Sequence, residues 1–136
     1  MSANQNEYNP LLVSCFVGSP TVDKTVPVTY LPRKTKVIGA YLLNNAGIAA
    51  DNANYAAISL KVGGTTIGSL DTRAANQGAV TQNAAKAFAM QAANQEVPAG
   101  STLTLVYDET DAGTNVALTD AQVVLQLAQI DTAQAA

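Results

Sequence analysis

The stretch Tyr55–Leu70, with the sequence YAAISLKVGGTTIGSL, carries the clearest local structural signal in the chain. Two runs rich in aliphatic and β-branched residues flank the dipeptide Gly63-Gly64. A two-residue hairpin turn needs a positive φ, which Gly adopts without steric cost. The stretch therefore predicts two antiparallel strands, Tyr55–Val62 and Thr65–Leu70, joined by a tight turn.

Further strand patterns lie on both sides of this hairpin. Lys36–Leu43 is apolar at odd and even positions, which indicates a strand that is buried on both faces or covers an interface. Ser101–Asp108 alternates, with Leu103, Leu105 and Tyr107 on one side. Leu11–Val17 and Ala121–Ile130 are two further predicted strands, and a helix capped by Asp120 is the alternative for the second.

Two stretches carry weaker patterns. Thr21–Tyr30 alternates in part, but Pro27 lies within it and removes a ladder donor, which favours an edge strand or an extended arm. Asp71–Gln95 is rich in Ala, Asn and Gln and could be helical on propensity. We favour a long loop there, followed by a short strand at Lys86–Gln91 in which Phe88 points inward.

These patterns predict an all-β chain that folds as an antiparallel β-sandwich of jelly-roll type with about eight strands. Short strands separated by Gly and Pro are typical of sandwiches and barrels, and the long connections favour Greek-key wiring. We expect one sandwich domain at 11–130. A flexible polar N-terminal arm at 1–10 precedes it, and a loose C-terminal tail at 131–136 follows it.

The composition limits the chemistry that the chain can perform. The 136 residues include no His, no Trp and one Cys. Imidazole acid–base catalysis and His-ligated metals are thereby excluded, as are an intrachain disulfide and a multi-Cys zinc site. We expect Cys15 to be a small buried hydrophobic residue. The sequence predicts no enzyme, no cofactor and no metal site.

Targeting signals are also missing from the sequence pattern. Residues 1–7 carry no basic region, and no apolar region of a secretory signal follows them. No run of 18 apolar residues exists, so no transmembrane helix is expected. We expect synthesis in the cytoplasm and no membrane partner.

Charged residues are scarce and unevenly distributed. They make up 12% of the chain, about half the usual share of ~25%, and 25 Ala with 20 Asn and Gln take their place. Residues 1–86 hold all seven bases and four acids, which gives +3, whereas residues 87–136 hold six acids and no base, which gives −6. This asymmetry either steers self-association or docking, or reflects chance placement on solvated loops.

The basic cluster comprises Arg33, Lys34 and Lys36, directly after Pro32. It forms either a solvated turn or a docking patch for an acidic surface on a partner or a neighbouring copy. A nucleic-acid site would need a wider basic stripe and stacking aromatic side chains. We therefore expect no nucleic-acid partner.

An acidic cluster, Asp108, Glu109 and Asp111, begins a predicted loop over Asp108–Asn115. Oxygen-rich loops can hold Ca²⁺, but the twelve-residue EF-hand pattern is not matched here. A solvated hairpin tip is the simpler interpretation. We expect the acidic cluster to complement the basic cluster across an interface.

Four segments carry a resemblance to a known family: KVIGAYLLNN at 36–45, ISLKVGGTTIGSL at 58–70, VPAGSTLTLVY at 97–107 and VVLQL at 123–127. They resemble the small capsid cement, or decoration, proteins of tailed bacteriophages, which have jelly-roll folds. The regions that hold these segments, 36–70 and 97–130, make up about half of the chain.

The resemblance implies a structural virion protein that binds the outside of the capsid and bridges major capsid protein subunits. It also implies a homo-oligomer, either a dimer or a trimer, on the virion capsid surface after synthesis in the host cytoplasm. Because jelly rolls also serve as lectins, the alternative is a phage fibre or tail module that binds host surface glycan.

Overall fold

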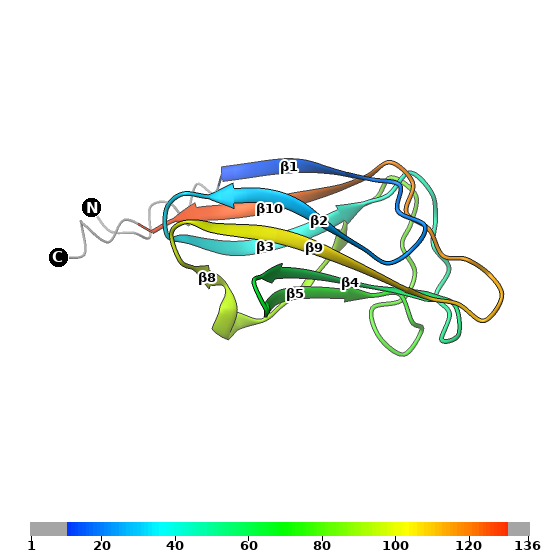
Figure 1. Cartoon of the computed structure of the whole chain (residues 1–136). Helices are drawn as coiled ribbons and strands as arrows, with labels where there is room; N and C mark the ends of the chain where they lie inside the picture. The colour runs from blue at the N-terminus through cyan, green and yellow to red at the C-terminus, as the bar shows by residue number, and fades with distance from the viewer. Residues whose placement is uncertain (1–10, 131–136) are drawn as a thin grey trace.

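The computed structural model describes residues 11–130, which form two antiparallel sheets packed face to face (Figure 1). Sheet A contains β1 (Leu11–Gly18), β10 (Ala121–Gln129), β3 (Thr35–Leu43) and β6 (Lys86–Ala87), with β8 (Glu96–Val97) also beside β3. Sheet B contains β2 (Lys24–Leu31), β9 (Ser101–Thr110), β4 (Tyr55–Val62), β5 (Thr65–Asp71) and β7 (Ala89–Met90). The predicted β-sandwich is confirmed. The predicted arm at 1–10 and tail at 131–136 lie outside the described residues.

The strand order is that of a jelly roll. Four antiparallel pairs are nested along the chain: β1 with β10, β2 with β9, β3 with β8, and β4 with β5. This is the pattern of one long hairpin that has been rolled up, with the β4–β5 turn at its tip. The pairings β10–β3 and β4–β9 then join the nested pairs into two sheets.

The hairpin at the tip forms as the sequence predicts. Val62 pairs with Thr65, and Gly63 between them has a φ of +58°. A positive φ at the first central residue is the requirement of a II′ turn. A bulge follows, because Leu60 pairs with Gly68 while Lys61 pairs with Thr66.

The structure has ten strands where about eight were expected. Three of the ten, β6, β7 and β8, are only two residues long, and they lie in the Ala-, Asn- and Gln-rich stretch where β propensity is low. Ala92–Asn94 between them is a 3₁₀ turn, and residues 11–130 contain no α-helix. The helical alternative at Asp120 is therefore wrong. No helix within the described range is long and apolar enough to cross a membrane.

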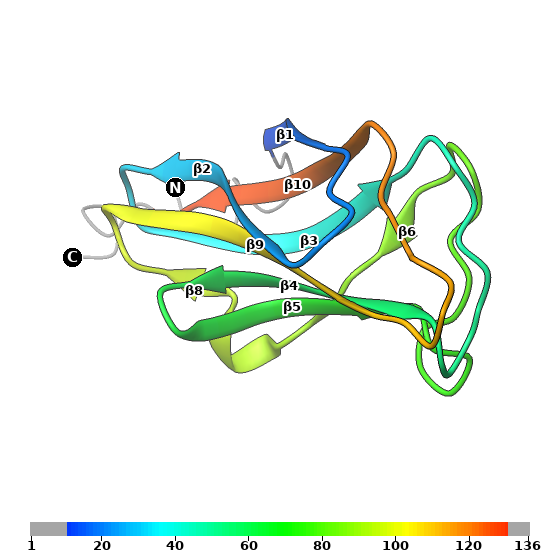
Figure 2. The same ribbon diagram turned by 45° about the vertical axis from the view of Figure 1, so that its right-hand side comes forward.

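Phe88 marks the point where the chain crosses from one sheet to the other. β6 just before it pairs with β3 in sheet A, and β7 just after it pairs with β5 in sheet B. Figure 2 shows this segment running down the side of the sandwich. The Phe88 side chain is buried, in agreement with its predicted inward orientation. The Phe88 amide donates to the Ala40 carbonyl over 2.9 Å.

β3 differs from the prediction because it contains a bulge. Leu127 pairs with Val37 and Gln126 pairs with Gly39, so Ile38 is an extra residue that shifts the alternation. Val37, Ala40 and Leu42 consequently face the core from both sides of the bulge, while Ile38, Tyr41 and Leu43 are half-buried on the outer face. The strand is thus fully buried on one face only.

The core fills the space between the sheets with aliphatic side chains and one tyrosine. Its largest fully buried members include Leu42, Ile58, Leu60, Ile67, Leu70, Leu103, Leu105, Tyr107, Leu118 and Leu125. Cys15 is not among them, contrary to expectation. It is half-buried on β1, where desolvation raises the pKa of its thiol.

Replacement of Phe88 tests the crossing between the sheets. Phe88→Ala removes the ring from its buried position and leaves a cavity, which should lower the free energy of unfolding by ~3–5 kcal/mol. The measurement is urea unfolding followed by circular dichroism. Val22→Ala, at an exposed apolar side chain, is the control and should change stability by less than ~0.5 kcal/mol. Equal effects of the two substitutions would contradict this assignment.

Candidate functional site

The two ends of the sandwich are built from different connections. The turns at 32–34, 63–64 and 98–100 lie together at one end, which we call the hairpin end. The segments at 19–23, 44–54, 72–85 and 111–120 lie at the opposite end, which we call the loop end. Since antiparallel strands send alternate connections to opposite ends, residues far apart in the sequence gather at each end.

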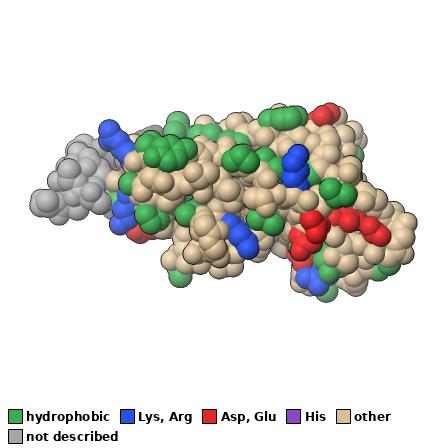
Figure 3. Space-filling model, in the orientation of Figure 1, with side chains coloured by type: hydrophobic (Ala, Val, Ile, Leu, Met, Phe, Trp, Pro, Cys, Tyr) green, Lys and Arg blue, Asp and Glu red, His purple; other side chains and the backbone are tan. Residues whose placement is uncertain are grey.

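The hairpin end is basic. Among residues 11–130, its charged residues are Arg33, Lys34, Lys36, Lys61 and Glu96, which together give +3. In Figure 3 basic side chains mark this end on the left, whereas acidic side chains gather toward the right. The predicted basic cluster therefore lies at one extremity of the molecule, where Lys61 joins it.

The turn that carries the basic cluster is held by short-range contacts. The Thr35 hydroxyl donates to the Arg33 carbonyl over 2.8 Å, and Thr35 is buried. The Lys34 ammonium lies 3.6 Å from a Glu96 carboxylate oxygen, and Glu96 is the strand partner of Lys36. Both side chains of the ion pair are largely exposed, so the pair contributes little to stability. Arg33 has no ion pair with any residue between 11 and 130.

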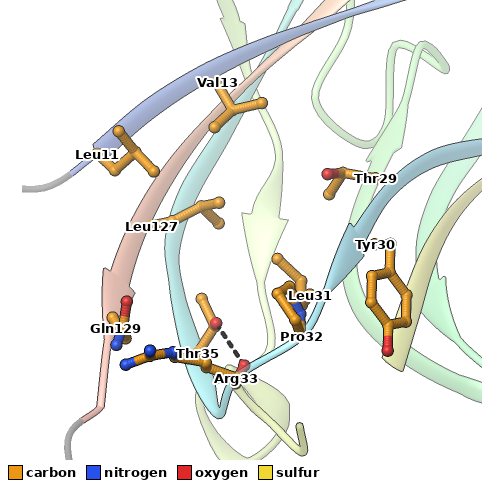
Figure 4. A pocket seen from close by; sticks show the side chains of 10 residues that line it. All are labelled: Leu11, Val13, Thr29, Tyr30, Leu31, Pro32, Arg33, Thr35, Leu127 and Gln129. Carbon is orange, nitrogen blue, oxygen red and sulfur yellow. Dashed lines mark hydrogen bonds between the residues drawn. The ribbon is translucent and has the colours of Figure 1, made fainter. Parts of the chain in front are cut away.

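A groove of about 430 Å³ opens beside Arg33, between the edges of the two sheets (Figure 4). Leu11, Val13 and Leu127 line it from sheet A, and Tyr30 and Leu31 line it from sheet B. Its walls are thus mainly apolar. The groove offers a surface for contact, with one guanidinium at its rim.

The loop end is acidic. Of the residues that the structure describes, the acids at this end are Asp23, Asp51, Asp71, Asp108, Glu109, Asp111 and Asp120, and the bases are Lys24, Arg73 and Lys86, which together give −4. One of these carboxylates is paired closely: Arg73 Nη2 lies 2.6 Å from Asp71 Oδ2, and the Arg73 guanidinium stacks 4.5 Å from the centroid of Tyr55. The Arg73 guanidinium and its backbone amide outweigh desolvation and hold the pKa of Asp71 below its ordinary value.

A loop is predicted over Asp108–Asn115, but most of the acidic cluster lies in a strand. Asp108 and Glu109 belong to β9, which continues to Thr110, and only Asp111 lies beyond the strand. The Glu109 amide donates to Asp23 Oδ1 over 2.9 Å, so a carboxylate distant in sequence joins the cluster. The Tyr107 hydroxyl donates to the Val116 carbonyl and anchors the following loop beneath this cluster.

The crowding of carboxylates shifts two pKa values. The Val116 amide, 3.2 Å from Glu109 Oε1, lowers the pKa of Glu109, but desolvation and the neighbouring Asp111 and Asp23 carboxylates together raise it above 4.5. Burial, with Glu109 and Asp23 nearby, raises the pKa of Tyr107 far above its usual value. The Tyr107 hydroxyl therefore keeps its proton and remains a donor. Among the described residues, no set of three Cys, Asp or Glu side chains has a geometry that could hold a metal ion.

The basic and acidic clusters do not meet within one chain. Arg33, Lys34 and Lys36 lie at the hairpin end, and Asp108, Glu109 and Asp111 lie at or beside the loop end. Along the sequence, the net charge changes sign after residue 86. In the folded chain, the net positive and net negative charges are separated between the two ends of the molecule. Sequence reasoning missed Asp23, Lys61 and Glu96, because only the folded chain brings them to the same ends of the molecule as these clusters.

The outer faces of the two sheets also differ. Strand register places eight uncharged residues side by side on the outside of sheet A, and we call them the uncharged face: Leu12, Ser14, Phe16, Tyr41, Leu43, Gln122, Val124 and Gln126. Lys36 and Glu96 share the outer side of sheet A only at its hairpin end, whereas the outer face of sheet B carries Lys61, Asp71 and Asp108 among Ser and Thr residues. Interface centres are depleted of charged residues, so sheet A has the face suited to protein contact.

Comparisons with known proteins identify no relative. No protein-family model, no curated protein and no solved structure matches the chain. The candidate site is therefore defined by its own geometry: the uncharged face of sheet A, with the basic hairpin end at one side of it.

Replacement of Glu109 tests the acidic cluster at the loop end. Because the pKa of Glu109 is raised in the folded chain, its contribution to stability is present below pH 4.5 and is lost as the pH rises through its folded value. Glu109→Gln removes the charge and keeps an oxygen for the Val116 amide. We expect a higher Tm than that of the parent at pH 7 and a smaller difference at pH 3.5.

The measurement is thermal unfolding at both pH values. Glu96→Gln removes one negative charge at the opposite end, beside Lys34, and should not raise the Tm at pH 7. If the Tm of the Glu109 variant at pH 7 is lower than that of the parent, repulsion among the carboxylates of the cluster does not destabilise the fold.

Proposed function

We propose that this chain is a structural protein of bacteriophage particles, a capsid cement protein that binds the outside of the shell and bridges major capsid protein subunits. The observation that carries the proposal is the uncharged face of sheet A, flanked by a basic end. The sequence resemblance to phage decoration proteins supports the same role. On this proposal the protein acts by contact on the capsid surface.

The uncharged face suits a large, tight contact. Leu12 and Phe16 are 62% and 68% exposed, although they are large apolar side chains. Their burial against a partner would release ordered water and favour association. Gln122 and Gln126 on the same face can form hydrogen bonds with a partner's backbone without the desolvation cost of a charge.

The basic hairpin end suits a second, orienting contact. The Thr35 hydrogen bond and the buried Thr35 side chain hold the turn in place, so Arg33 projects from a fixed backbone (Figure 4). A guanidinium at the rim of an interface increases the association rate and selects an acidic partner surface. We propose an acidic patch on the major capsid protein as that partner surface.

Charge reversal tests this contact. Arg33→Glu should weaken binding to capsids that lack the protein by about tenfold at low salt, because it replaces attraction by repulsion at the rim. Lys61→Glu makes the same change of charge at the same end but on the outer face of sheet B, and should have a smaller effect. Binding is measured by co-sedimentation with purified particles at two salt concentrations.

The outcomes separate the candidate roles. Equal binding by the Arg33 variant and the parent, at both salt concentrations, would exclude the basic turn from the contact. Failure of the parent protein to bind capsids would overturn the proposed function. Binding to host cells or to isolated surface glycan in place of capsids would favour the fibre or tail alternative.

A further inference from the structure

The edges of the two sheets are protected unequally. Sheet A ends at β6 and β8 on one side, and sheet B ends at β7 on the same side; each of these strands has only two residues. The opposite edge of sheet B is β2, which carries Lys24, Pro27 and a bulge at Val28. Short strands, charged residues, Pro and bulges are the devices by which proteins prevent edge-to-edge association.

β1, at the remaining edge, lacks most of these devices. Its eight residues, LLVSCFVG, include no Pro and no charged residue. Its register with β10 is regular from Leu11 to Phe16, and the one irregularity lies at its end, before Gly18. Within the described chain β1 pairs with β10 and with no other strand, and it forms the rim of the sandwich in Figure 2. No residue between 11 and 130 pairs with the backbone donors and acceptors on its outer side.

We propose that β1 pairs with β1 of a second copy of this chain, antiparallel and about a twofold axis. The pairing joins the two copies of sheet A into one continuous sheet. This inference goes beyond the proposed function, since it does not depend on a capsid. It identifies the strand through which two copies meet.

The side chains of β1 select a register for this pairing. Leu12, Ser14 and Phe16 lie on the same face of the strand, and the two large ones are exposed. A register centred on Ser14 places Leu12 of each copy opposite Phe16 of the other. Directly opposed side chains in an antiparallel pair lie about 4.5–5.5 Å apart and stabilise one another, aromatic with aliphatic included. The two side chains would then pack against each other along the junction, and their outward surfaces would stay open on the outer face of the joined sheet.

The charges of the molecule favour the same arrangement. When β1 runs antiparallel to its copy, the hairpin end of one molecule lies beside the loop end of the other. Among the described residues, the hairpin end carries +3 and the loop end carries −4. Unlike charges therefore meet at each end of the interface. The basic cluster at Arg33 and the acidic cluster at Glu109 would thus approach each other between copies. β1 itself is uncharged, so the central strands meet without repulsion.

Edge substitutions test the proposal in solution. The double variant Leu12→Lys, Phe16→Lys should raise the Kd of the dimer by at least about 100-fold, because it removes two apolar contacts and adds charge to the edge. The control is Val22→Lys, since Val22 is 66% exposed but lies outside the strands. The mass of the full chain is measured by sedimentation equilibrium, and circular dichroism shows whether each variant is folded.

A cross-link tests the register directly and does not depend on the edge substitutions. In a Cys15→Ser background, Ser14→Cys places one thiol of each copy beside the twofold axis. The two thiols are then directly opposed and within disulfide reach. Mild oxidation should give a covalent dimer in high yield. Val22→Cys in the same background should stay mostly monomeric on a denaturing gel.

Three outcomes would overturn the proposal. The first is a parent chain that is monomeric at all concentrations up to the millimolar range. The second is a dimer that neither responds to the Leu12 and Phe16 substitutions nor cross-links through position 14. The third is a dimer that is lost when residues 1–10 are deleted, since the arm of a neighbouring copy would then be the occupant of the edge. Capsid binding is measured separately, so each proposal can fail without the other.

Discussion

The alternation of apolar and polar residues along β9 and β10 holds the two sheets in register with the core. These strands lie between two neighbours in each sheet, and their inward side chains, such as Leu105 and Leu125, are fully buried against each other's sheet. A slip of one residue in either strand would move the whole apolar set to the outside. The same alternation fixes what points outward, so the uncharged face around Gln126 follows from the packing of the core.

Short sequence patterns predict much of this architecture. The features that depend on pairing between strands far apart in the sequence could not be predicted. The hairpin at Gly63 and the alternation of β9 are encoded within about ten residues, so the sequence is sufficient to identify them. The bulge at Ile38 depends on the register between β3 and β10, which no short pattern of β3 specifies. The contact of Asp23 with Glu109 depends on β2 pairing with β9, so the acidic cluster could be predicted only in part.

The charge distribution shows how topology converts a linear pattern into a surface. Along the chain, all seven bases lie in residues 1–86 with four acids, and the other six acids follow in residues 87–136. In the fold, a charged residue lies at the hairpin end or the loop end according to which connection or strand end holds it. Glu96 therefore joins Lys34 among the bases, and Asp23 joins the later acids, although the sequence places each in the opposite half. Because the charged residues lie in the connections and at the strand ends, the middle of sheet A is free of charged side chains.

The two proposals have a geometric consequence when they are taken together. A twofold axis through paired β1 strands runs perpendicular to the joined sheet, so the outer faces of both copies point in the same direction. Two uncharged faces, each with Leu12 and Phe16 near the junction, would then form one extended surface. A dimer that binds a shell through this surface makes two contacts at once, and the second forms at a high effective concentration. Modest affinity for each capsid subunit would then suffice for stable attachment, and attachment at two neighbouring subunits is what bridging them requires.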